Sequence, residues 1–284
     1  MSSPIALVTD STCDLPDTFL EQYAIQVVPH YVIWGRQEFR DRVNLRPEDF
    51  YSRLESDPTR PTSAQATAAD FAAAYRAALE LGAGQIVTLT VSSAMSGAYQ
   101  SACMAAEQVK VPVQVIDSKG PTFSLGWQVL AAARARQAGG GVAEMVAAAG
   151  QVRQRLVLVV GMDTLEYLQR GGRIGGAARW LGTALQIRPI VSINHVSGLV
   201  EPVGLTRTHR SMVDMVYRTF FEKLANGGAL HVAVLHGSAP QEAAALAERV
   251  RSEYNPGELL VNITGPVLGI NTGPGALALS GYRE

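Results

Sequence analysis

Cysteine and long apolar runs are both scarce in this chain of 284 residues. Its cysteines, Cys13 and Cys103, lie 90 positions apart, a separation that matches neither a metal-binding nor a redox motif. No apolar stretch approaches the ~18 residues that a membrane-spanning helix needs, so we expect no stable membrane insertion. Nor do the histidines form a zinc-binding pattern, and we expect no metal site. These histidines are His30, His195, His209, His231 and His236.

Neither sign of charge dominates the chain. Its 24 Lys and Arg residues are balanced by 25 Asp and Glu residues, which gives a formal net charge of −1. Proteins that bind nucleic acid or a membrane surface by long-range attraction carry an excess of basic residues. The segment Met1–Asp10 has no basic region and turns acidic before an apolar run reaches signal length. We therefore expect a cytoplasmic protein with reduced thiols and no nucleic-acid partner.

Hydrophobic residues make up 47% of the chain, enough to build two packed domains or one large one. In the first half, short apolar runs alternate with helical segments, which favours a parallel sheet covered on both faces. Pro29 places part of the second run at a sheet edge or bulge. The expected strands span 4–9, 25–33, 86–91 and 113–117, and the expected helices span 16–23, 47–54, 67–81, 98–109 and 122–137, with one more ending near 155.

The second half has a different pattern, with strands that follow one another across a short turn. Strands are expected at 156–162, 187–193, 199–203, 230–235 and 258–263, and helices at 164–170, 177–185, 207–224 and 240–254. The sequence therefore predicts an α/β protein of two domains. Residues 1–155 form a Rossmann-like parallel sheet with flanking helices, and residues 156–284 form an α+β domain with a mixed sheet.

Polar clusters follow three of the predicted parallel strands, at residues 10–12, 92–97 and 117–119. Because the carboxyl ends of parallel strands share one edge, these clusters should meet there, and the loop 60–65 could join them. Hydroxyl groups in front of helix N-termini suit an anionic group such as a carboxylate or phosphate.

The same residue types are also ordinary helix caps. We favour this capping role for Ser11, Thr12, Ser118 and Thr122, and ligand contact for Ser96, which ends a hydroxyl-rich loop.

Catalytic motifs are absent from the sequence. The context of Ser96, residues 94–98, lacks the G-x-S-x-G frame of a hydrolase, and no phosphate-binding P-loop occurs. The glycine-rich segment 171–176 follows a predicted helix, whereas a dinucleotide fingerprint follows a strand. Asp163 and Glu166 stand at a helix start, where carboxylates complement the helix dipole. We therefore assign no catalytic residue and no cofactor.

Seven blocks of the chain, in order, resemble the DegV family, and together they span nearly its whole length. The blocks are IALVTDSTCDLP (5–16), RPTSAQATAADF (60–71), VSSAMSGAYQSA (91–102), VIDSKGPTFSLG (115–126), DTLEYLQRGGRIGGAARWLGTALQIRPI (163–190), PVGLTRT (202–208) and GPVLGINTGPGALAL (265–279). Characterised members of that family are fatty-acid-binding subunits of bacterial fatty acid kinases.

The resemblance implies a non-catalytic carrier that buries a long-chain fatty acid and holds its carboxylate near the domain junction. By position, the carboxylate ligands fall on Ser63 and Ser96, and Asn271 is a third candidate. A partner kinase subunit, related to dihydroxyacetone kinases, would convert the carboxylate to an acyl phosphate for phospholipid synthesis. Secondary candidates for the surroundings of the carboxylate are Thr62, Ser93, Gly97, Arg170, Arg173 and Arg207. The arginines could equally dock the kinase or form helix-end and interdomain salt bridges.

Two positions depart from the family pattern. A threonine–serine pair of the family reads Ser63-Ala64 here, so one hydroxyl is lost. The block usually written GTHVGPG places Asn271 where the family has a histidine. Asparagine can donate a hydrogen bond but does not titrate near neutral pH, which changes the expected pH behaviour and kinase efficiency.

A carrier of this kind would gain its affinity from the acyl tail. Burial of about 14 methylenes at ~0.8 kcal/mol each contributes about 11 kcal/mol before ordering costs. The head group need only be satisfied by hydrogen-bond donors. Residues expected either to line such a pocket or to form ordinary core are Phe123, Leu125, Trp180, Leu181 and Leu185. Two alternatives remain: a stand-alone acyl hydrolase or transferase, and a binding module for another amphiphilic acid.

Overall fold

The first half of the chain builds a sheet of four parallel strands. The computed structural model describes residues 4–182 and 187–284. From edge to edge, the strands of this first sheet are β2 (Ile25–Val28), β1 (Ile5–Asp10), β6 (Gln85–Thr90) and β7 (Val113–Asp117). The two central strands are buried on both faces, as expected for continuous apolar runs in a parallel sheet.

Helices cover both faces of the first sheet. One face packs on α3 (Ala68–Glu80) and α4 (Ala98–Ala106), and the other packs on α5 (Phe123–Gln137) and α6 (Val142–Arg155). Thr67 and Asp70 form a capping box at the start of α3, in which each side chain accepts a hydrogen bond from the other's backbone N–H. A 3₁₀ helix (Ser11–Cys13) and α1 (Asp17–Gln22) follow β1.

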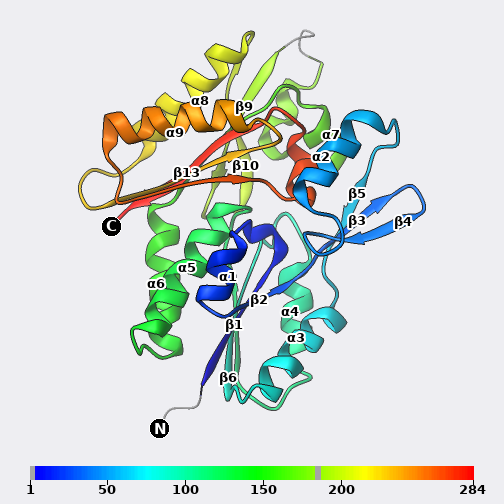
Figure 1. Cartoon of the computed structure of the whole chain (residues 1–284), viewed down its shortest axis with the longest axis vertical. Coiled ribbons are helices and arrows are strands. Elements are labelled where there is room, and N and C mark those ends of the chain that lie inside the picture. The colour runs from blue at the N-terminus through cyan, green and yellow to red at the C-terminus, as the bar shows by residue number, and fades with distance from the viewer. Residues whose placement is uncertain (1–3, 183–186) are drawn as a thin grey trace.

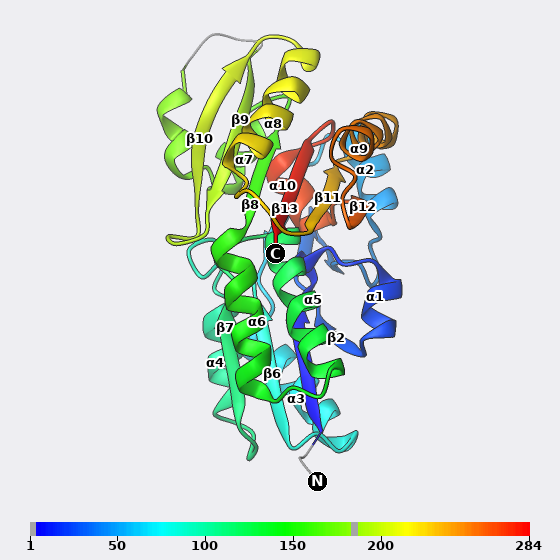
Figure 2. The same ribbon diagram turned by 90° about the vertical axis from the view of Figure 1, so that its left-hand side faces the viewer.

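The second half of the chain forms a mixed sheet of six strands, which lies above the first sheet in Figures 1 and 2. In order across the sheet, the strands are β10 (Leu199–Thr206), β9 (Arg188–Asn194), β8 (Val157–Gly161), β13 (Leu277–Arg283), β11 (Leu230–His236) and β12 (Glu258–Ile263). All neighbours are antiparallel except β11 and β12. The predicted α/β class, with a parallel sheet and a mixed sheet, is confirmed.

The two faces of the second sheet have different partners. Helices α8 (His209–Lys223) and α9 (Pro240–Tyr254) cover the outer face, as Figure 1 shows. The inner face turns toward α5, whose Trp127 donates a hydrogen bond from Nε1 to the carbonyl of Ser280 on β13. A single apolar cluster therefore includes Leu7 of the first sheet, Trp127, and Ala278 of the second sheet.

A small antiparallel sheet stands beside these two. Its strands are β4 (Gln37–Arg40), β3 (Tyr31–Trp34) and β5 (Thr62–Ala64), and it packs with α2 (Pro47–Ser56) and α10 (Pro266–Thr272). No strand or helix was expected at β4, β5, α10 or β13. The single strand expected at 25–33 was wrong, because the chain leaves β2 before Pro29 and His30 and enters a different sheet at β3.

Short helices connect β8 to β9. They are α7 (Glu166–Gly171), which ends at Gly172 in the left-handed conformation, and a 3₁₀ helix (Gly175–Trp180). The helix expected at 177–185 is replaced by this 3₁₀ turn as far as Trp180, and its part at 183–185 lies outside the described residues. Within the two described ranges, no helix has the length and apolar character needed to cross a bilayer.

Candidate functional site

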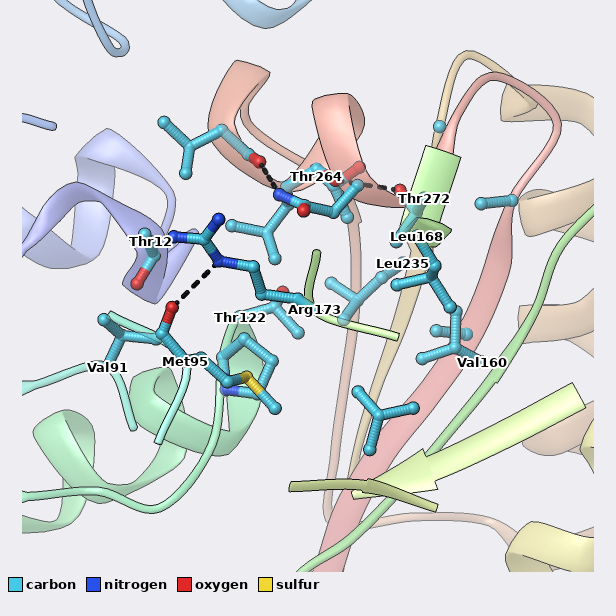
Figure 3. Close-up of a pocket in the computed structure, with 18 of the residues that line it drawn as sticks. Thr12, Val91, Met95, Thr122, Val160, Leu168, Arg173, Leu235, Thr264 and Thr272 are labelled. Carbon is cyan, nitrogen blue, oxygen red and sulfur yellow. Dashed lines mark hydrogen bonds between the residues drawn. The ribbon is translucent and has the colours of Figure 1, made fainter. Parts of the chain in front are cut away.

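A cavity lies between the inner face of the second sheet and the loops at the carboxyl end of the first sheet (Figure 3). It offers about 120 Å³ to the centres of water-sized molecules. On that measure a single water needs about 10–15 Å³, so the space suits a larger ligand. In Figure 3, Arg173 and Met95 lie at one side of the cavity, and Val160, Leu168 and Leu235 lie at the other.

The apolar wall comes mainly from alternate residues of the second sheet. Side chains of successive strand residues point to opposite faces, so one set faces α8 and α9 while the other faces the cavity. The sheet residues of the apolar wall are Leu158 and Val160 on β8, Val191 and Ile193 on β9, Val200 on β10, Leu235 on β11, and Leu277 and Ala278 on β13. Such a wall can bury an alkyl chain but cannot satisfy a charged group.

Polar side chains gather at the other end, at the carboxyl edge of the parallel first sheet. Of the three predicted polar clusters, 10–12 and 92–97 contribute to the cavity wall, whereas 117–119 contacts Ser93 outside it. The polar residues of the cavity wall are Thr12, His30, Ser63, Gln65, Ser96, Thr122, Arg173, His236, Thr264, Asn271 and Thr272. Ser63 and Ser96 are half-buried, whereas Gln65 and Arg173 are exposed. This end therefore forms the mouth of the cavity.

The hydroxyl groups of the threonines in the wall already donate hydrogen bonds to other groups of the protein. Thr12 Oγ1 donates to Asp10 at 2.5 Å, and Thr122 Oγ1 donates to Asp14 at 2.7 Å. Thr272 Oγ1 donates to the carbonyl of Leu268 at 3.1 Å. Such hydroxyls can accept a hydrogen bond but have no proton left for an anionic ligand.

The two serines at the mouth differ from these threonines. Ser96 Oγ accepts a hydrogen bond from the backbone N–H of Ala98 at 3.2 Å, so its own proton remains free. Ser63 forms no side-chain hydrogen bond with any described residue. Both serines can therefore donate to an anion in the cavity.

The loop that carries Ser96 is held by Gln65. Gln65 Oε1 accepts a hydrogen bond from the backbone N–H of Gly97 at 2.8 Å. A Cβ atom at Gly97 would lie 2.4 Å from that same oxygen, so only glycine allows this approach. The bond links the segment after β5 to the loop after β6, and it holds Ser63 and Ser96 in one site.

Arg173 and Asn271 complete the mouth. Arg173 donates from Nε to the carbonyl of Met95 at 3.0 Å, as Figure 3 shows, and from Nη1 to the carbonyl of Gly171 at 2.6 Å. Asn271 donates from Nδ2 to the carbonyl of Val267 at 2.9 Å, while its Oδ1 has no partner among the described residues. Arg173, from the second half of the chain, therefore contacts the loop that carries Ser96.

The structure places the expected site residues in two groups. Ser63, Ser96, Asn271 and Arg173 lie together in the cavity wall. The others lie outside it: Thr62 is exposed on β5, Ser93 faces Asp117 and Lys119, Gly97 binds Gln65, Arg170 pairs with Glu166, and Arg207 is exposed before α8.

The residues expected either to line a pocket or to form ordinary core do not line the cavity where the structure describes them. Phe123 and Leu125 are fully buried in the core shared by α5 and both sheets, so the core alternative holds for them. Trp180 packs against the same core, and Leu181 is 42% exposed. Leu185 lies outside the described residues. The apolar wall of the cavity instead comes from strands of the second sheet, whose inner and outer faces could not be told apart by sequence.

Sequence reasoning also missed His30 and did not single out Gln65. Gln65 belongs to the loop expected to join the polar clusters, so position alone could have indicated it. His30 sits in an apolar run and gave no sign of a site. In residues 4–182 and 187–284, no three acidic, cysteine or histidine side chains converge as metal ligands.

The fold and the cavity define an α/β protein that encloses a narrow apolar pocket with a polar mouth, a geometry suited to an amphiphilic small molecule. The model of the DegV family, described as a family of uncharacterised proteins, matches residues 4–284. The chain belongs to the DegV family.

Similarity to individual relatives covers nearly the full length. A DegV domain-containing protein of Streptomyces coelicolor is 36% identical over 282 residues, which is 98% of each chain. The solved structure of a DegV family protein from Thermus thermophilus, described as binding fatty acid, has a TM-score of 0.91, 32% identity and 99% coverage of both chains. Bacillus subtilis DegV, described as a fatty acid binding protein, has a TM-score of 0.90, 26% identity and complete coverage of both chains.

Proposed function

We propose that this protein binds one long-chain fatty acid, with its tail on the inner face of the second sheet and its carboxylate at the mouth. The observation that carries the proposal is the division of one cavity into an apolar wall and a polar end whose free donors are Ser63 and Ser96. The fatty acids described for the Thermus and Bacillus relatives support the same ligand class.

The division of labour follows from the energies of the two parts. Each buried methylene contributes ~0.8 kcal/mol, so the tail supplies most of the affinity. The carboxylate would be strongly disfavoured in the cavity without hydrogen bonds, and the serine hydroxyls, Asn271 and Arg173 lie where they can surround it. Hydroxyl donors leave carboxylate oxygens less tightly held than a bidentate arginine would.

We further propose that the protein is a carrier without chemistry of its own. Ser96 has no imidazole among its hydrogen-bond partners in the described residues. A serine–histidine pair does occur, with Ser124 Oγ 2.8 Å from His195 Nε2, but Ser124 is fully buried and lies outside the cavity wall. It therefore offers no nucleophile to a bound acyl group.

The half-buried mouth supports presentation of the carboxylate to a partner kinase. With the tail enclosed, the carboxylate would be the part of the ligand nearest the surface, between Gln65 and Arg173, both of which are exposed. A dihydroxyacetone-kinase-like subunit could then phosphorylate it to an acyl phosphate, which is the role implied by the resemblance.

Fatty acid binding is tested by lipid extraction and by serine substitution. Mass spectrometry of lipid extracted from the purified protein should find one long-chain fatty acid per chain. Ser96→Ala should weaken oleate binding about tenfold, because one hydrogen bond to a charged group contributes ~1.5 kcal/mol. Ser93→Ala, in the same loop but outside the cavity, should leave affinity unchanged. Equal oleate affinity in wild type and Ser96→Ala would contradict the assigned carboxylate site.

The kinase step is tested separately. Acyl phosphate formation by a fatty acid kinase subunit, measured with ATP and oleate, should require this protein. It should also fall in the Ser96→Ala variant. Release of acid from activated acyl esters by this protein alone would instead support a stand-alone hydrolase.

A further inference from the structure

The imidazole of His30 is buried in the cavity wall, and no hydrogen bond within the described residues satisfies its Nε2 atom. Its side chain is 3% exposed and lines the cavity, and Nε2 has no hydrogen-bond partner among the described residues. A buried polar atom without a partner costs about 1–3 kcal/mol, so such atoms normally have a structural or ligand partner.

The nearest charged group does not satisfy the imidazole. Asp10 Oδ1 lies 3.6 Å from His30 Nε2, which is too long for a hydrogen bond. The Oδ1 atom of Asp10 already accepts two hydrogen bonds, from the backbone and hydroxyl of Thr12, and its Oδ2 accepts one from the backbone of Val91. Asp10 therefore supplies negative charge beside the ring while the ring remains available to a ligand.

Strand register places His30 near the proposed carboxylate ligand Ser63. Val32 pairs with Ser63, and His30 immediately precedes β3, two residues before Val32. His30 and Ser63 both line the cavity. Residues two apart on a strand share a face, and diagonal neighbours lie about 7–8 Å apart. A carboxylate held by Ser63 would therefore lie within reach of the imidazole.

The charges around His30 are mostly negative. Asp10 on β1, Asp41 after β4 and Asp70 on α3 all favour the imidazolium. Burial alone lowers the pKa of His30, but these carboxylates outweigh it and the pKa lies above its usual value. Arg173 is the cation in the same cavity wall, and it is engaged with two backbone carbonyls.

Asp41 and its neighbours also affect the charge around His30. Burial raises the pKa of Asp41 to about 7, although Ser11 donates a hydrogen bond to it at 2.6 Å. Arg42 pairs with Asp14 at 3.4 Å, whereas the basic group that faces Asp10 is His30.

We infer that His30, as an imidazolium backed by Asp10, donates a hydrogen bond to the carboxylate of the bound fatty acid. His30 is then protonated in the complex, so binding takes up a proton wherever His30 is neutral in the free protein. The inference rests on the proposed fatty acid binding. It adds a carboxylate ligand on the β2–β3 connection and makes affinity depend on pH.

The sign of the pH dependence follows from linkage. A bound carboxylate adds negative charge beside His30, so the pKa of His30 must be higher in the complex than in the free protein. Affinity is therefore greatest below the free-protein pKa, falls up to about tenfold per pH unit between the two values, and is low and constant above the complex value. Proton uptake on binding is largest in that window.

The test is calorimetric titration with oleate between pH 6.5 and 9 in two buffers of different ionisation enthalpy. The wild type should take up close to one proton per oleate in part of this range. His30→Gln should take up none and should bind about tenfold more weakly at pH 6.5, since it lacks the charge-assisted hydrogen bond. At pH 9 the two proteins should bind alike.

Two controls separate His30 from other sources of protons. Oleate methyl ester, which carries no charge, should bind without proton uptake. His236→Gln should leave the proton count unchanged, because burial lowers the pKa of His236 and its Nδ1 accepts from the backbone N–H of Ala239.

The outcomes distinguish the role of His30 from the proposed binding of fatty acid. Oleate binding by the wild type without proton uptake at any pH would overturn the role of His30 and leave the proposed function standing. Failure of the wild type to bind oleate at all would remove both. If His30→Gln does not fold, the wild type still tests the inference, because oleate binding without proton uptake would overturn it.

Discussion

Among the residues of the cavity wall, Ala278 is a small side chain placed between two larger ones. In the mixed sheet it pairs with Val160 on one side and with Leu235 on the other, and all three line the cavity. A small side chain between two large ones leaves a groove across the strands. The groove, rather than any polar group, is what would accept the tail.

We expect Ala278→Phe to block this groove. If the ring excludes about four methylenes at ~0.8 kcal/mol each, oleate affinity falls about 100-fold. Thermal stability should change little, because the ring fills space that is already open. Val261→Phe adds the same ring to a 46% exposed position on β12 and should leave affinity unchanged. Full oleate affinity in Ala278→Phe, measured by titration, would show that the tail lies elsewhere.

Among the elements, the β9–β10 hairpin has a role beyond its own sheet. Its turn reaches the first sheet, where Ser92 Oγ donates to the carbonyl of Gly198 at 2.9 Å and Ser124 bonds His195. Ser92 begins the loop that carries Ser96. The hairpin of the second half therefore braces a site loop of the first half.

Gly198→Ala should break this brace. Gly198 has φ +76° and a Cβ there would lie 2.1 Å from Ser92 Oγ, so both backbone strain and a clash arise. Gly139 has φ +89° with open space around it, so Gly139→Ala reports the strain alone. We expect Gly198→Ala to lower the free energy of unfolding by about 1–3 kcal/mol more than Gly139→Ala does. Urea denaturation measures both, and equal losses would mean that the contact is unimportant.

The elements also show where sequence patterns succeed and fail. The alternation of strands and helices predicted β1, β6, β7 and their helices, because each is a local pattern flanked by clear turns. β13 was not predicted although it lies in the middle of the second sheet. Its residues 277–283 include Ser280 and Gly281, and the run becomes a strand through pairing with β8 and β11, which come from distant parts of the chain.

For the whole molecule, the apolar core does not divide where the sheets do. Each sheet takes its strands from one side of residue 155, and we propose a domain boundary there. Yet α5 packs on β1 and β6 with one side and on β13 with the other. The cavity likewise combines both halves: its mouth contains Ser63 and Ser96 from the first half and Arg173 and Asn271 from the second, which also supplies most of the apolar wall.

We therefore expect the chain to unfold in one cooperative transition. Separation of the halves would expose α5 and the inner face of the second sheet to water, which opposes independent unfolding. Calorimetric and van't Hoff enthalpies should agree, and saturating oleate should raise the melting temperature of that single transition. Two resolved transitions, with oleate shifting only one, would contradict a shared core.

The sequence alone determined the α/β class, the parallel first sheet and the edge where its polar clusters meet, because these depend on local periodicity and on the direction of parallel strands. It also placed Ser63 and Ser96 as candidates, through a family resemblance. Only the tertiary structure decided which threonine protons are already used, which sheet face is open, and that His30 joins Ser63 in one wall. Those properties arise from contacts between segments far apart in the chain, and no local pattern encodes them.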